Sequence, residues 1–129
     1  MTSSILKKEI IKIITDYEEN FNSKNIKIIK SKEYKAFVEG IIVSCGSLKE
    51  YVENINDNFY NAAGFRTKVL NSIDKILNDY ILKNKPYLNN SKFQSKAEKQ
   101  YIDGVLIACS EIWKYVKKMD INKEVSAHE

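Results

Sequence analysis

One proline, Pro86, and four glycines are the only strong helix breakers among the 129 residues of this chain. Between them, apolar residues recur at intervals of three and four, which is the spacing that lines one face of an α-helix. A chain with so few breakers and this period is constrained to fold as packed helices. We therefore predict an all-α, single-domain bundle of four to six helices that spans residues 1–129 and ends in a polar tail over 122–129.

The first two periodic segments give the expected positions of the N-terminal helices. The first helix is expected to begin near Ser3 or Ser4, whose hydroxyls can accept hydrogen bonds from the unpaired amides of a first turn. The most regular spacing runs from Tyr34 to Phe59 and predicts one long helix, bent near Gly46. Because glycine commonly ends a helix, two shorter helices are the alternative.

The expected helix boundaries are more clearly marked in the second half of the chain. A third helix is expected from Phe65 to Tyr80, and the segment Lys83–Ser91 around Pro86 is expected to form a loop. Ser95 and Glu98 then stand three residues apart directly before an apolar run, which is typical of a capping box at a helix start.

The last helix, from about Ser95 to Met119, is apolar around nearly its whole circumference between residues 101 and 113. Such a helix lies at the centre of a bundle or forms an oligomer interface. We therefore consider a homodimer through the surface around Tyr101, Leu106 and Trp113. Gly104 is expected to let a neighbouring backbone approach closely. We find no internal repeat by this reading.

Two cysteines, Cys45 and Cys109, fall within apolar helical patterns. We interpret them as small buried hydrophobes of a reduced compartment rather than as a disulfide. The longest apolar run is far shorter than a membrane span requires, and lysines interrupt the apolar residues that a signal peptide would need near the N-terminus. We expect a cytoplasmic protein without a membrane span.

Catalytic chemistry has little support in the sequence. The one histidine, His128, lies in the polar tail, which argues against histidine-dependent triads, zinc sites and metal hydrolases. Glu50, Glu53 and Asp57 share a helical face, but the Glu-x-x-His elements of di-metal bundles are missing, so we interpret this face as solvated. We predict a non-enzymatic protein with no catalytic residues, no metal and no cofactor.

A lysine strip is the first candidate for partner binding. Its five members fall within twelve residues that contain a single acid, and the first three follow helical spacing: Lys24, Lys27, Lys30, Lys32 and Lys35. Such a strip can contact phosphates, an anionic lipid surface or an acidic protein face. A solvated face of a lysine-rich protein is the plainer alternative.

Arg66, the only arginine among twenty lysines, is the second candidate. Its planar guanidinium bonds a carboxylate or phosphate bidentately, which lysine cannot do. An internal salt bridge at the margin of the apolar stripe is the alternative.

These observations predict a protein that acts by binding. We expect a helical interaction protein whose partner is another protein, such as an inhibitor, an immunity factor or a small regulatory subunit of the kind that phages and mobile elements encode. The alternative is a basic nucleic-acid-binding module or a small subunit of a ribonucleoprotein complex, which rests on the lysine strip.

Overall fold

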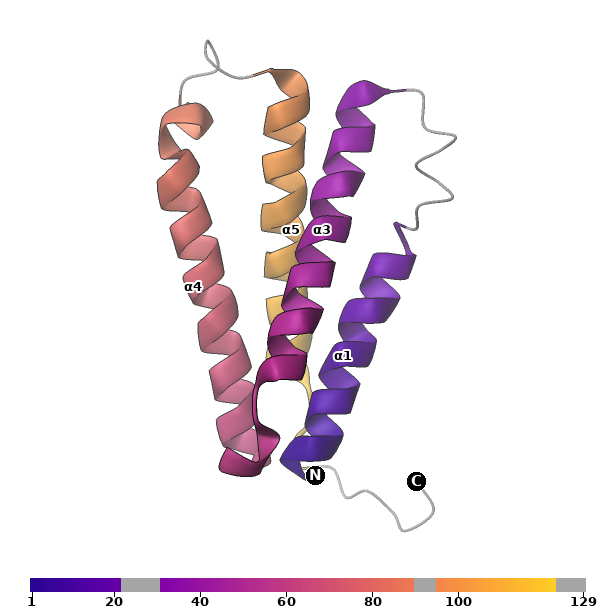
Figure 1. Cartoon of the computed structure of the whole chain (residues 1–129), viewed down its shortest axis with the longest axis vertical. Helices are drawn as coiled ribbons and strands as arrows, with labels where there is room; N and C mark the ends of the chain where they lie inside the picture. The colour runs from indigo at the N-terminus through magenta and orange to yellow at the C-terminus, as the bar shows by residue number, and fades with distance from the viewer. Residues whose placement is uncertain (22–30, 90–94, 123–129) are drawn as a thin grey trace.

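Four long α-helices make up most of what the computed structural model describes, which is residues 1–21, 31–89 and 95–122, with residues 84–89 described by their backbone alone (Figure 1). The helices are α1 (Ser3–Glu19), α3 (Lys32–Asn54), α4 (Ala62–Asn89) and α5 (Lys96–Lys118), and a short 3₁₀ helix, η1 (Asp57–Phe59), joins α3 to α4. The predicted all-α architecture is confirmed, with four α-helices in the described residues.

The helices alternate in direction along the chain, so that α1 and α4 run one way and α3 and α5 the other (Figure 1). Each consecutive pair, α1 with α3 and α4 with α5, is an antiparallel hairpin. The closest packing in the molecule is nevertheless between α3 and α5, which run parallel. The last helix is therefore central, as its apolar circumference predicts.

The helix starts follow capping chemistry. Ser31 and Ser95 cap α3 and α5, and the Ser95 hydroxyl accepts a hydrogen bond from the Glu98 amide at 3.1 Å, which confirms the predicted start. In α1 the cap is Thr2, whose hydroxyl accepts from the Ile5 amide at 3.1 Å. The expected cap at Ser3 or Ser4 is thus displaced by one residue, because Ser3 lies inside the helix and donates to the Asp57 carbonyl instead.

Helix α3 passes through Gly46 without interruption, so the prediction of one helix holds over Lys32–Asn54. Its predicted end near Phe59 is wrong. Ile55 has an extended backbone and ends the helix, yet its side chain still reaches the core, with 8% of its surface exposed. The apolar spacing therefore continues beyond Asn54, although the backbone there is no longer helical.

The predicted loop at Lys83–Ser91 is also wrong over most of its length, since α4 continues to Asn89. Proline keeps a φ angle that suits a helix, and its cost arises from the missing N–H and from contact with the preceding turn. Pro86 stands within the last turn of α4, so the bond that its missing N–H would make to the carbonyl of Leu82 is lost, but only three helical residues follow it.

The core lies between all four helices. Its fully buried members include the large side chains Phe65, Leu6, Ile10, Ile14, Ile41, Leu48, Ile73 and Ile112. They come from the periodic stripes that predict the helices, so the same spacing that favours each helix also supplies its buried face.

Two glycines let α3 and α5 approach until their backbones touch. A Cβ atom on Gly104 would lie 2.1 Å from the carbonyl oxygen of Phe37, and one on Gly40 would lie 2.3 Å from that of Tyr101. Each glycine therefore meets the carbonyl three residues before the other glycine. The predicted role of Gly104 is confirmed, and its reciprocal partner is Gly40.

This reciprocity reflects an internal repeat. At an offset of 64 residues, α3 aligns with α5 without gaps, and the capping serines also match. Identical residues within the helices are Lys32 and Lys96, Lys35 and Lys99, Gly40 and Gly104, Cys45 and Cys109, Tyr51 and Tyr115, and Val52 and Val116. The run Ile-x-Lys-Ile-x-x-Asp-Tyr likewise occurs at 10–17 and at 73–80.

The conclusion from the sequence that the chain contains no internal repeat is therefore wrong. The chain is a tandem pair of similar helical hairpins, packed through their second helices. All amphipathic helices share the same apolar spacing, so this spacing does not reveal the similarity between α3 and α5. The equivalent positions of Gly40 and Gly104 in the structure do reveal it.

Candidate interaction surface

The lysine strip is described only in part. Lys24, Lys27 and Lys30 lie outside the described residues, whereas Lys32 and Lys35 are exposed in the first turn of α3. The structure therefore brings together two of the five predicted contacts, on a solvent-exposed helix start.

Arg66 is held within the molecule. Its Nη1 donates a hydrogen bond of 2.8 Å to the carbonyl of Met119, the C-terminal cap of α5. Among the described residues this partner is a backbone carbonyl rather than the carboxylate of the expected internal salt bridge. A cation there also complements the negative end of the helix dipole.

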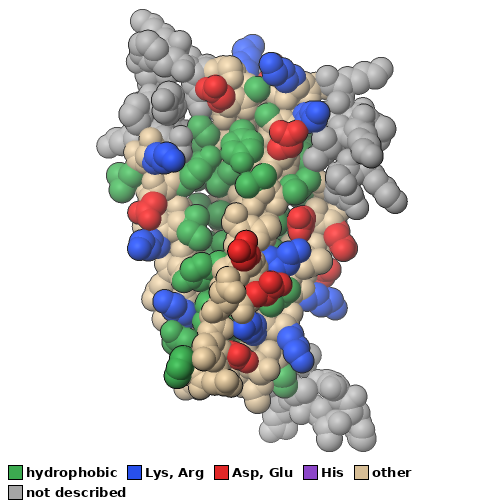
Figure 2. All heavy atoms as spheres, viewed as in Figure 1, with side chains coloured by type: hydrophobic (Ala, Val, Ile, Leu, Met, Phe, Trp, Pro, Cys, Tyr) green, Lys and Arg blue, Asp and Glu red, His purple; other side chains and the backbone are tan. Residues whose placement is uncertain are grey.

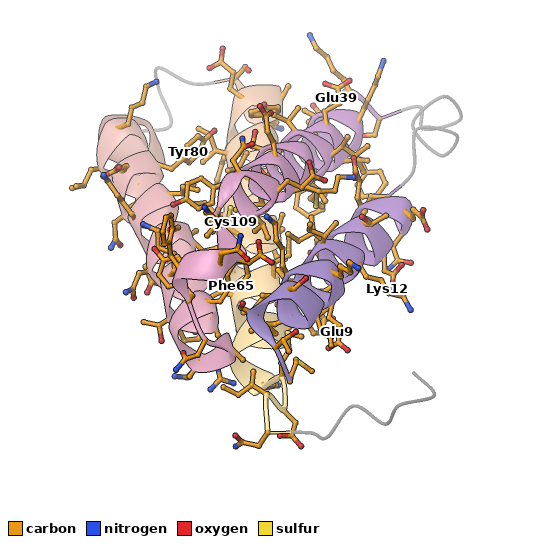
Figure 3. The ribbon with its side chains drawn as sticks, turned by 60° about the horizontal axis from the view of Figure 1, so that its bottom comes forward. Glu9, Lys12, Glu39, Phe65, Tyr80 and Cys109 are labelled. Atoms are coloured by element: carbon orange, nitrogen blue, oxygen red, sulfur yellow. The ribbon has the colours of Figure 1, made fainter. Side chains whose placement is uncertain are left out.

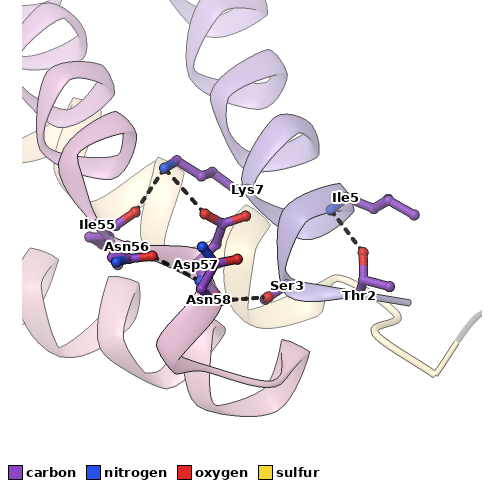
Figure 4. A network of polar contacts seen from close by, with 8 residues as sticks. All are labelled: Thr2, Ser3, Ile5, Lys7, Ile55, Asn56, Asp57 and Asn58. Atoms are coloured by element: carbon purple, nitrogen blue, oxygen red, sulfur yellow. Dashed lines mark hydrogen bonds and ion pairs between the residues drawn. The ribbon is translucent and has the colours of Figure 1, made fainter.

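The first hairpin closes its corresponding end in a similar way (Figure 4). Lys7 donates to the carbonyl of Ile55 at 2.7 Å and lies 3.8 Å from the Asp57 carboxylate. Ile55 caps α3 as Met119 caps α5, and the two positions are 64 residues apart. A basic side chain from the neighbouring helix thus closes the second helix of each hairpin.

The two cysteines are free and buried, as expected. Burial raises the pKa of the Cys109 thiol to about 11. Burial, aided by the nearby Glu18 carboxylate, raises the pKa of Cys45 to about 12. Both thiols are therefore protonated at neutral pH and pack as apolar groups rather than act as nucleophiles.

The three carboxylates that share a helical face in the sequence do not share one in the structure. Glu50 and Glu53 are exposed on α3, but Asp57 lies in η1 beyond the helix end and faces Lys7. Among the described residues, no three potential ligands gather to hold a metal ion. Within the same residues, no helix is both long and apolar enough to cross a membrane.

A hollow with a volume of about 210 Å³ lies between α3, α4 and α5. We call it the α3–α4 hollow, and its lining is mostly apolar: Val43, Ser44, Ser47, Leu48, Ile76, Tyr80, Tyr101, Val105 and Cys109. It is open because the backbones of α3 and α4 approach each other far less than those of α3 and α5. Figure 2 shows hydrophobic side chains gathered between these two helices.

The walls of the α3–α4 hollow combine an exposed edge with a buried floor. Val43 is 51% exposed at the edge, while Cys109 forms part of the floor with 1% exposed. Tyr80 extends from α4 into the space between the helices (Figure 3), and burial raises the pKa of its hydroxyl. Ser44 is satisfied, because its hydroxyl donates to the Gly40 carbonyl at 2.7 Å.

The apolar surface continues along α3 towards the base of the bundle. The hydroxyls of Tyr51 and Ser72 lie 2.7 Å apart and join α3 to α4 below the hollow. Beyond them, a second and more polar hollow of about 270 Å³ is lined in part by Tyr51 and Phe59. Phe59 is 79% exposed, which is unusual for a phenylalanine side chain beside a hollow.

The face equivalent to the α3–α4 hollow lies between α5 and α1, and it differs. Tyr17, the equivalent of Tyr80, packs there against Phe21 and Tyr115, with ring centroids 5.6 and 6.4 Å away. Glu111 takes the place of Ser47. Burial of the Tyr17 hydroxyl, and to a smaller extent the Glu111 carboxylate, raise the pKa of Tyr17 to about 12. The hollow that remains there includes Asp16 and Asn20 in its lining.

The helix proposed for a homodimer is largely covered within the chain. Tyr101 and Trp113 pack against the core and are half-buried, as is Leu106. The large hydrophobic side chains that α5 exposes are Ile107 and Tyr115 instead.

No protein-family model, no curated protein and no solved structure matches this chain.

The sequence analysis missed the α3–α4 hollow. Its lining residues all belong to the predicted helices, and the spacing within a helix does not show which residues line a hollow and which lie in the core. The available signals were the small residues Gly46 and Ser47 at the surface of α3, beside Val43, where a helix that is fully covered by neighbours would have larger apolar groups.

Proposed function

We propose that this protein acts by binding another protein, as an inhibitor, an immunity factor or a small regulatory subunit does. The observation that carries the proposal is the apolar surface along the groove between α3 and α4, which contains the α3–α4 hollow and the second hollow beside Phe59. Val43, Tyr51 and Phe59 follow one another down this groove with 51, 37 and 79% of their surfaces exposed. Single exposed apolar residues are ordinary, but a row of them beside a hollow is typical of a protein contact surface.

Charge supports the same choice over nucleic acid. Exposed Glu39 and Glu50 of α3 border the groove, and Lys68 of α4 lines its second hollow. The exposed lysines Lys32 and Lys35 lie apart at the start of α3. Nucleic-acid binders depend on a basic face that releases counterions from phosphates. The described groove has no such face.

Site-specific photocrosslinking tests the proposal. Benzoylphenylalanine placed at Val43 or at Phe59 should capture a discrete protein in the host cell, whereas the same group at exposed Lys12 on α1 should not. The purified chain should bind no RNA or DNA at low salt. Salt-sensitive binding of nucleic acid without protein capture at either groove position would contradict the proposal and favour a nucleic-acid-binding module.

A further inference from the structure

The rim of the α3–α4 hollow carries two carboxylates at a defined spacing. Glu39 precedes Val43 by four residues and Glu50 follows it by seven, so all three lie on one stripe of α3. Both glutamates are exposed, and Figure 3 shows Glu39 on the outer side of α3. Eleven residues of helix separate them by about 16 Å.

We propose that the α3–α4 hollow receives an apolar side chain from an amphipathic helix of a protein partner, and that Lys or Arg residues of that helix, about three turns apart, pair with Glu39 and Glu50. This inference rests on the proposed function and names the partner's chemistry.

The size and setting of the hollow favour a side chain on a helix. Its volume of about 210 Å³ suits one large apolar group, since an apolar cavity of about 150 Å³ holds benzene. The hollow opens onto the groove between two separated helices, and a third helix laid in such a groove presents apolar residues at i, i+4 and i+7. The row of Val43, Tyr51 and Phe59 extends the apolar contact along that direction.

The opposite rim does not cancel this preference. Asp79 and Lys83 follow Ile76 on α4 by three and seven residues and are both exposed. Lys68, eight residues before Ile76 on the same helix, lines the second hollow, so these three residues of α4 add one positive charge. The two carboxylates of α3 outweigh it and leave a net negative charge, and electrostatic attraction of this kind acts mainly on selectivity and association rate.

The repeat supplies a matched control on α5. Ile107 occupies the place of Val43 and is 42% exposed, against 51% for Val43. The equivalents of Glu39 and Glu50 are Asp103 and Lys114, which have opposite charges. A helix drawn to Val43 by two carboxylates should therefore not be drawn to Ile107.

The direct test is a methyl NMR titration of the full chain with three amidated peptides of one length. The first has leucine at i, i+4 and i+7 with lysine on its flanks, the second has glutamate in place of lysine, and the third has alanine in place of leucine. Saturable shifts are expected for Val43, Ile76 and Val105 with the first peptide, and binding at least about tenfold weaker with the other two.

Variants sharpen the result. Val43→Glu should abolish binding of the lysine peptide, whereas Ile107→Glu should leave it unchanged. Glu39→Lys with Glu50→Lys should transfer the preference to the glutamate peptide. Because these positions are exposed, unchanged melting curves should accompany each variant.

Three results would overturn the inference: no saturable shift up to about 1 mM lysine peptide, equal or tighter binding of the glutamate peptide, or shifts centred on Ile107. If crosslinks at Phe59 still captured a protein, the proposed function would stand and only this inference would fail. If no position captured protein and RNA shifted the resonances of Lys32 and Lys35, both would fail.

Discussion

In the first hairpin, Lys49 of α3 pairs with Glu18 of α1 at 3.1 Å, whereas the equivalent position of the second hairpin is Trp113. The indole Nε1 of Trp113 is buried and has no hydrogen-bond partner among the described residues. The first hairpin thus has an ion pair between α3 and α1 at this position, and the second hairpin has the large apolar ring of Trp113 on α5. The second hairpin therefore has an apolar ring at this position, at the cost of an N–H that is unpaired among the described residues.

Other positions are the same in both hairpins. The serine caps, the crossing glycines and the buried cysteines recur at one offset, and each has a structural task that its neighbours impose. Differences also occur around the outer grooves, such as Ser47 against Glu111. The comparison teaches that the repeat preserves the caps, the glycine crossing and the buried cysteines, while the grooves differ, and the more apolar of the two is the candidate binding surface.

The largest expected effect is at the glycine crossing. Gly104→Ala and Gly40→Ala should each reduce the free energy of unfolding by about 3 kcal/mol, because a backbone carbonyl cannot rotate away from the added methyl group. Urea denaturation measures this. Gly46→Ala is the control, since nothing lies within 4 Å of its added Cβ, and it should stabilise α3 by about 0.5–1 kcal/mol. Unchanged stability in both crossing variants would refute backbone contact between α3 and α5.

Equivalent core positions should respond alike. Ile112 and Leu48 are 64 residues apart, and 0 and 2% of their surfaces are exposed. Ile112→Ala and Leu48→Ala should each cost about 2–5 kcal/mol through lost burial and the cavity left behind. A cost below about 1 kcal/mol for one of them in thermal or urea unfolding would show that the hairpins do not share a core position there.

Alkaline pH should weaken the fold through both cysteines. The unfolded thiols have a pKa of about 8.5, whereas the folded ones have values of about 12 for Cys45 and about 11 for Cys109. The unfolded chain therefore loses its thiol protons first as the pH rises. The stability that the neutral thiols provide is complete below about pH 8.5 and should fall by about 2 kcal/mol per thiol at pH 10.

Urea unfolding between pH 8 and about 9.5 measures this slope below the pKa of about 10 at which Tyr17 ionises in the unfolded chain. The double variant Cys45→Ala with Cys109→Ala should flatten the slope, whatever its stability at neutral pH. An unchanged slope in the double variant would mean that the thiols are not the groups responsible.

The smallest expected effect is at the position where the hairpins differ most. Trp113→Phe should change stability by less than about 1 kcal/mol, because the loss of ring area is offset by removal of the unpaired N–H. Trp113→Ala, which removes the ring altogether, should cost about 3 kcal/mol or more. A large loss in the phenylalanine variant would show that the indole N–H has a partner after all.

The helices could be predicted from the sequence because spacing and caps are local properties. Leu6, Ile10 and Ile14 define a buried stripe by their spacing alone, and Ser95 with Glu98 fixes a helix start. The end of α3 could not be predicted in this way. Ile55 continues the spacing but enters the core from extended backbone, so the period does not report where the helix stops.

The candidate surface depends on tertiary relations that no local pattern contains. Whether Val43 is core or rim depends on the separation of α3 and α4, and α3 instead approaches α5 closely at Gly40 and Gly104. Arg66 stands out in composition, but its acceptor is a carbonyl 53 residues away. Only the folded chain shows that pairing.

The central claim is that two similar hairpins pack through reciprocal glycines, and nuclear Overhauser contacts test it most directly. A Cβ on Gly40 would lie 3.2 Å from the amide nitrogen of Val105, and one on Gly104 would lie 3.2 Å from that of Ile41. The account predicts strong cross-peaks from the Gly40 α-protons to the Val105 amide proton and from the Gly104 α-protons to the Ile41 amide proton. If the α-protons of both glycines showed contacts only within their own helices, the account would be contradicted.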